Sequence, residues 1–147
     1  MLLSLDGDTK KIEDIIPGDS VVSYDIETGE NYITEVVKVI TKENTTDIAE
    51  IVFDNDTIIK MNAYHPLYCE DGFRSITRYN GYNELVVGNN VKTANGWSKI
   101  VNINRYISEP IVTYNLDVHN IGEYPDADTN DTYYVNGIVA KNGSGFC

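Results

Sequence analysis

Short segments rich in β-branched and aromatic residues alternate with turn residues along nearly the whole chain. This pattern favours strands over helices, because branched and aromatic side chains pack well on a pleated surface. Hairpin turns are expected at Asn55-Asp56 and at Asn136-Gly137, since each pair separates two apolar runs. The segments predicted to contain strands are residues 20–26, 31–42, 47–55, 57–64, 72–79, 83–106, 110–119 and 132–142.

Helical periodicity is found in one place, where Ile12, Ile15 and Ile16 are spaced three and four residues apart. That spacing predicts a short amphipathic turn of helix. The region 120–130 is rich in turn residues and is expected to be a loop. A chain of 147 residues suits one domain. Many short strands with frequent turns then indicate an all-β sandwich or barrel-like domain.

The charge of the chain narrows the classes of partner. Lysine and arginine total 11 while aspartate and glutamate total 23, which gives a net charge of −12. No nucleic-acid partner is expected, because binding to a polyanion needs a basic surface. No membrane partner is expected either, since no apolar run reaches the roughly 18 residues of a spanning helix. The first residues lack the features of a signal peptide.

Metal and disulfide chemistry are weakly indicated. Cys69 and Cys147 are too few for a disulfide framework, and we expect no bond between them. They leave the compartment open, and a cytoplasmic location is expected. Cys69 follows His65 by four residues, but zinc needs further ligands and only His119 and Cys147 remain as good donors. We therefore predict neither a metal nor a cofactor.

The acidic run 126–131, DADTND, begins like a calcium-binding loop. The full pattern needs a glycine at the sixth position and a glutamate at the twelfth, where this chain has Asp131 and Gly137. The run is therefore interpreted as a solvated acidic loop. A calcium-binding β domain built around it is kept as an unrelated alternative.

Two residues are candidates for chemistry on the backbone. Pro66 biases His65 toward an extended conformation, in which an imidazole can be aimed at a neighbouring peptide. Taken alone, His65 is interpreted as a half-buried structural residue. Asn142 precedes Gly143, and an asparagine amide can attack its own backbone carbonyl, which forms a succinimide and breaks the chain. An ordinary turn residue or a deamidation site is the simpler interpretation of the same pair.

Four segments stand in a suggestive order along nearly the whole chain. Residues 12–19 read IEDIIPGD, 57–73 contain HPLY after Asn62, 84–97 read ELVVGNNVKTANGW and 132–142 read TYYVNGIVAKN. Together they resemble the Hint domain, the fold shared by inteins, bacterial intein-like domains and hedgehog autoprocessing domains. The resemblance implies an all-β, horseshoe-shaped fold of mostly antiparallel short strands. It also implies that the two chain ends lie close together at the centre.

The resemblance implies roles for three residues directly. His65 matches the histidine that strains the upstream scissile peptide and protonates the departing amide. Asn62 occupies the position of the family's threonine and would donate a hydrogen bond to the same peptide. Asn142 matches the asparagine that cyclises to release the downstream segment.

Four further positions depart from the family pattern. Lys141 stands where a penultimate histidine assists cyclisation, and a lysine of ordinary pKa is not tuned near neutrality. Asn115 stands where an acidic residue is common. Asp131 stands near a second histidine and would be an acid or base only if its pKa were raised. Gly143 offers no side-chain acceptor, so ordinary ligation is not expected.

The family's nucleophile, a cysteine or serine several residues before the Asp6-Gly7 turn, is not found in this chain, and Met1 cannot replace it. We expect residues 1–142 to form the Hint domain and 143–147 to be a flanking tail. The resemblance implies a domain that acts once on its own flanking polypeptide rather than turning over a substrate, and we expect at most slow cleavage at Asn142. The alternative is a degenerate Hint domain, or the large fragment of a split intein that binds a short N-terminal complement.

Overall fold

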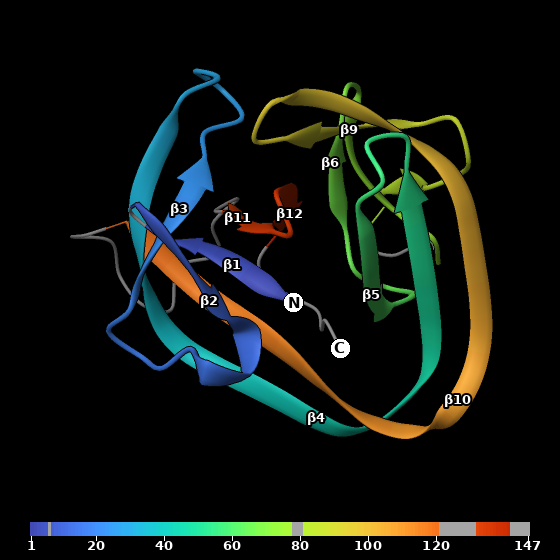
Figure 1. The fold of residues 1–147 in the computed structure, drawn as a ribbon, viewed down its shortest axis with the longest axis horizontal. Coiled ribbons are helices and arrows are strands. Elements are labelled where there is room, and N and C mark those ends of the chain that lie inside the picture. The colour runs from blue at the N-terminus through green and yellow to red at the C-terminus, as the bar shows by residue number, and fades with distance from the viewer. Residues whose placement is uncertain (6, 78–80, 121–131, 142–147) are drawn as a thin grey trace.

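The structure, a computed structural model, describes residues 1–5, 7–77, 81–120 and 132–141. These residues form a β fold with a horseshoe outline (Figure 1), and all described strand pairs except β7–β8 are antiparallel. The all-β prediction is confirmed. The strands are β1 (Leu2–Leu5), β2 (Asp8–Lys11), β3 (Ser20–Tyr24), β4 (Asn31–Phe53), β5 (Ile58–Asn62), β6 (Leu67–Cys69), β7 (Gly72–Ser75), β8 (Asn83–Glu84), β9 (Asn90–Thr93), β10 (Gly96–Asn120), β11 (Thr132–Val135) and β12 (Ile138–Lys141).

Two long strands form the frame of the horseshoe. β4 has 23 residues and β10 has 25, and Figure 1 shows them curving together around the outside of the molecule. The sequence predicted breaks at residues 43–46 and 107–109, but both strands continue through these positions. The polar residues of β4 are held there by pairing with β10, and the hydroxyls of Thr45 and Thr113 lie 2.9 Å apart. Pro110 falls where the register shifts, as expected for a residue that cannot donate to the ladder.

Both predicted hairpin turns are confirmed. β4 turns into β5 through Asn55 and Asp56, and Asp56 has a positive φ of 67°. β11 turns into β12 through Asn136 and Gly137, whose φ values are 49° and 78°. Two consecutive positive φ values are what a two-residue turn matched to the twist of antiparallel strands requires.

The single predicted turn of helix is present as a 3-10 turn, η1 (Ile12–Asp14). Its burial follows the expected pattern in part: Ile12 and Ile15 are buried, whereas Ile16 is 59% exposed. No helical segment within the described ranges has the length and hydropathy of a bilayer-crossing helix.

The β11–β12 hairpin lies in the interior and joins strands from both sides of the horseshoe. On one side Val135 pairs with Leu3 of β1, and on the other Ala140 pairs with Leu67 of β6 and Ile138 with Thr93 of β9. The hairpin therefore connects the two halves through backbone hydrogen bonds. The buried apolar side chains of the core include Leu3, Ile12, Val21, Ile51, Phe53, Met61, Leu67, Val91, Ile100, Leu116, Val118, Tyr133, Val135 and Ala140.

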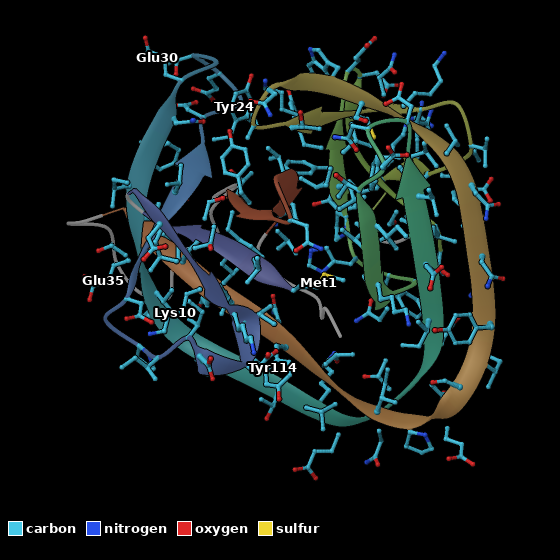
Figure 2. The ribbon with its side chains drawn as sticks, viewed as in Figure 1. Met1, Lys10, Tyr24, Glu30, Glu35 and Tyr114 are labelled. Carbon is cyan, nitrogen blue, oxygen red and sulfur yellow. The ribbon has the colours of Figure 1, made fainter. Side chains whose placement is uncertain are left out.

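An aromatic cluster closes the open end of the horseshoe. Tyr24, at the end of β3, lies near the β9–β10 hairpin (Figure 2). Its ring centroid is 5.9 Å from that of Tyr68 on β6, and the Lys92 Nζ of β9 lies 5.2 Å from the Tyr24 ring. The same ammonium group lies 5.7 Å from the ring of Trp97. Contacts of both kinds are attractive, so Tyr24 holds one arm against the other.

Replacing Tyr24 with alanine should therefore weaken the closure of the horseshoe. One aromatic pair and one cation–π contact are each worth about 1 kcal/mol, so Tyr24→Ala should lower the free energy of unfolding by about 2 kcal/mol. Urea denaturation measures this loss. Tyr106→Ala, a change to a half-exposed tyrosine on β10, is the control and should cost clearly less. Equal losses in the two variants would contradict the role given to Tyr24.

Candidate functional site

His65 lies in the short connection between β5 and β6, and its side chain is fully buried. A compact turn positions it: the His65 amide donates to the Asn62 carbonyl oxygen at 3.2 Å. The Asn62 side chain reinforces the turn, because its Oδ1 accepts a hydrogen bond from the Tyr64 amide at 3.0 Å. Asn62 is itself nearly buried, with 7% exposure. Its oxygen is thus engaged in the turn, and its amino group is the part suited to donation.

The end of β12 runs beside the residue that follows His65. The Lys141 amide donates to the Pro66 carbonyl oxygen at 3.2 Å, and the neighbouring Ala140 pairs with Leu67. The Lys141 side chain is half-buried. Residues 65 and 141, far apart in the sequence, are therefore brought together by consecutive backbone contacts between β12 and the start of β6.

Asn115 joins this group through β10. Its side chain is buried, with 7% exposure, and its Oδ1 lies 3.4 Å from the Tyr133 hydroxyl, which donates to it. Tyr133 also packs edge-on against His65, with ring centroids 6.4 Å apart. Complete burial raises the pKa of the Tyr133 phenol far above its ordinary value, so the hydroxyl stays protonated. Tyr133 thus lies between two of the predicted site residues.

Two of the six predicted site residues, Asn142 and Asp131, lie outside the described residues. The residues covalently bonded to them, Lys141 and Thr132, are described. Lys141 of β12 and Thr132 of β11 lie opposite each other as a cross-strand pair. Thr132 is buried, and its hydroxyl bridges to β3 by accepting from the Tyr24 amide at 2.8 Å and donating to the Tyr24 carbonyl oxygen at 2.9 Å. Asn142 and Asp131 are therefore attached to adjacent, firmly held positions. The acidic run 126–131 also lies outside the described residues.

The beginning of the chain is held by the other end of the same hairpin. Asn136 Oδ1 accepts a hydrogen bond from the Leu2 amide at 2.9 Å, and the Asn136 amide donates to the Leu2 carbonyl oxygen at 2.8 Å. Figure 2 places Met1 near the middle of the horseshoe, as the resemblance implied for this end. Residues 142–147, at the other end, are not described.

Cys69 is a free, buried thiol outside this group. Burial raises the pKa of the thiol to about 12, and the weaker influence of Arg74 acts in the opposite direction. The thiolate, which is the nucleophilic form, is therefore disfavoured. Within the described part of the chain, no three His, Cys, Asp or Glu side chains lie together as a metal site would require.

Sequence reasoning did not single out Tyr133 or Thr132. The alternation along β11 offered a signal, because residues 133 and 135 share one face of a strand and residues 132 and 134 share the other. The alternation assigns the residues of β11 to two faces of the strand, but it does not show which face contacts His65. The answer depends on the pairing of β12 with β6, which is a long-range contact.

Solved structures with the same architecture define the class of fold. A bacterial intein-like domain from Clostridium thermocellum is 24% identical, with a TM-score of 0.78 over 96% of this chain and 94% of that one. The gp41-1 intein is 20% identical, with a TM-score of 0.71 over 96% and 93% of the two chains. A DnaB intein from Synechocystis sp. PCC 6803 is 18% identical, with a TM-score of 0.72 over 97% and 94%. The chain therefore has the Hint, or intein-like, fold.

The family model named Pretoxin HINT domain matches residues 1–145, which is nearly the whole chain. The protein belongs to the pretoxin HINT domain family. The resemblance stated from the sequence motifs is thereby confirmed. No curated protein matches the chain.

Proposed function

We propose that the chain is a self-processing domain that cleaves its own flanking peptide bonds, once per molecule, by intein-like chemistry. Membership of the HINT family supports this class of activity. The observation that carries the proposal is the hydrogen bond from the Lys141 amide to the Pro66 carbonyl oxygen. It holds the end of β12, which leads to Asn142, beside the peptide that carries the His65 imidazole.

At the C-terminal side, Asn142 is the reacting residue. Its side-chain nitrogen attacks its own backbone carbonyl carbon, so that a new C–N bond closes a succinimide. The peptide bond to Gly143 breaks, and the Gly143 nitrogen leaves as an amine after it gains a proton. Lys141 and Asp131 are the neighbouring groups assigned to proton transfer and carbonyl polarisation. Lys141 is a poor substitute for histidine, because an imidazole accepts and donates protons at neutral pH more readily than an amine does.

At the N-terminal side, intein-like chemistry needs a cysteine or serine nucleophile, and a segment that carries one upstream of β1 would supply it. Its thiol or hydroxyl attacks the preceding carbonyl carbon, the peptide C–N bond breaks, and a thioester or ester forms. His65 gives a proton to the departing nitrogen, which is general-acid catalysis. The Asn62 amino group and Asn115 hold the same peptide. In this scheme residues 1–142 form the reacting domain and 143–147 are flanking peptide.

The free edge of β5 supports the entry of such an upstream segment. β5 pairs with β4 along one edge, and no other described strand pairs with it. Asn136 links the chain start to this strand, because its Nδ2 donates to the Ile58 carbonyl oxygen at 3.1 Å while its Oδ1 holds Leu2. The strand from Ile58 to Asn62 spans about 13 Å, so a segment of about five residues would reach Asn62.

The same edge favours a second candidate function. A strand with unpaired backbone groups accepts another strand readily, and Leu2 and Ile58 expose 44% and 49% of their surface near the chain start. A separate short N-terminal fragment would bind there as the complement of a split intein. If the site has lost its chemistry, this domain is a binding module for that fragment.

Cleavage at Asn142 is tested by intact-mass spectrometry of the 147-residue chain over several days. We expect a slow loss of residues 143–147 alone, which Asn142→Ala abolishes and His65→Ala leaves nearly unchanged. Lys141→His should accelerate the loss by about tenfold or more, because imidazole titrates near neutral pH. Cleavage at another bond, or cleavage that persists in Asn142→Ala, would count against the proposal.

The N-terminal step is tested with a version of the chain that carries about six extra residues beginning with cysteine, preceded by a reporter peptide. Dithiothreitol should release the reporter as a thioester, and His65→Ala should slow the release by about 100-fold through loss of the proton donor. The control replaces the added cysteine with alanine, which should prevent release. If the reporter stays attached although the added segment binds, the chain is a binding module instead.

A further inference from the structure

Tyr133 is the buried residue that connects the predicted site residues to one another. It is 0% exposed, and it pairs on β11 with Ala140, the residue before Lys141. Its hydroxyl donates to Asn115 Oδ1 at 3.4 Å, and its ring stands edge-on to His65 at 69° with 6.4 Å between ring centroids. None of the proposed cleavage steps uses Tyr133 directly.

The chemistry of a buried phenol makes these contacts directional. Because the hydroxyl stays protonated, it acts as a donor toward Asn115 and orients the carboxamide with its oxygen toward Tyr133. The backbone amide of Leu116 is a further hydrogen-bond partner of the phenol oxygen. Two contacts to β10 therefore fix the ring, and a fixed ring restricts the rotation of the imidazole packed against it.

We propose that Tyr133 is a positioning residue of the self-processing site, which holds the His65 imidazole and the Asn115 carboxamide in their working orientations. The inference rests on the proposed function for its effect on rate. The structural part of the inference is that the Tyr133 hydroxyl determines the orientation and tautomer of the His65 imidazole. This part can be tested in a protein that does not cleave. The reacting bond itself is not touched by Tyr133.

The neighbouring Tyr134 is a matched control provided by the chain. It lies on the same strand, is 3% exposed, and its hydroxyl also bonds to an asparagine oxygen, Asn31 Oδ1, at 2.5 Å. Because adjacent residues of a strand point to opposite faces, Tyr134 faces away from the His65 side of β11. Tyr133→Phe and Tyr134→Phe therefore remove the same chemical group, a hydroxyl that donates to an asparagine oxygen, from adjacent positions of one strand that face opposite ways.

The experiment compares three proteins: the wild type, Tyr133→Phe and Tyr134→Phe. Nuclear magnetic resonance of the imidazole nitrogens and the Hε1 proton reports the tautomer and surroundings of His65. We expect Tyr133→Phe to shift these signals and Tyr134→Phe to leave them at wild-type positions, while both variants lose a similar amount of thermal stability. In the chain extended by an upstream cysteine, Tyr133→Phe should slow thiol-induced release by about tenfold, and Tyr134→Phe should not.

The results of this experiment distinguish a failure of the Tyr133 inference from a failure of the proposed cleavage activity. If the wild type releases its reporter while Tyr133→Phe leaves both the rate and the His65 signals unchanged, the inference is overturned and the function stands. If both variants shift the His65 signals equally, Tyr133 has no special role and the inference is also overturned. If no protein cleaves but only Tyr133→Phe shifts the His65 signals, the function fails and the positioning of the imidazole is supported. If Tyr133→Phe does not fold, Asn115→Ala, which removes the acceptor of the same hydrogen bond, takes its place and should shift the same His65 signals; unchanged signals would overturn the inference.

Discussion

The two-residue turn at Asn136-Gly137 sets the register of the hairpin on which the rest of the site depends. The register of β11 against β12 determines that Tyr133 is opposite Ala140 and that Thr132 is opposite Lys141. A slip of one residue would turn every side chain of a strand to the opposite face. Tyr134 would then replace Tyr133 against His65, and the end of β12 would move relative to Pro66. Backbone geometry, rather than any charged group, therefore assembles the candidate site.

The two long strands convert this local register into a rigid frame. His65 follows β5, Asn115 lies within β10, and Lys141 ends β12, so the site draws on elements that the frame holds from different directions. Ion pairs add little to this arrangement: Lys10–Asp19 and Arg105–Asp47 are partly exposed, and exposed pairs contribute weakly to stability. Holding reacting groups in a fixed geometry lowers a barrier by pre-organisation.

The sequence predicted the parts of the structure that depend on local rules. Asn-Gly and Asn-Asp turns, β-branched runs and the spacing of Ile12, Ile15 and Ile16 each act over a few residues. The turns and the all-β class were confirmed, and the amphipathic turn was confirmed in part, because Ile16 is exposed. The continuity of β4 through residues 43–46 was missed, because those polar residues are extended only in response to β10, which is more than 50 positions away at Thr113. Tyr133 was missed for the same reason. Its partners His65 and Asn115 are identified by pairing between distant strands, which no local pattern encodes.

The central proposal is that the His65 imidazole and the Asn142 carboxamide share one small site. The most direct test is a nuclear Overhauser experiment on the folded chain, with the side chains of His65 and Asn142 selectively labelled. The account predicts cross-peaks between the imidazole ring protons and the carboxamide protons, together with cross-peaks from both to Tyr133. Well-resolved signals of both side chains with no cross-peak between them, and contacts from Asn142 to another part of the molecule, would contradict it.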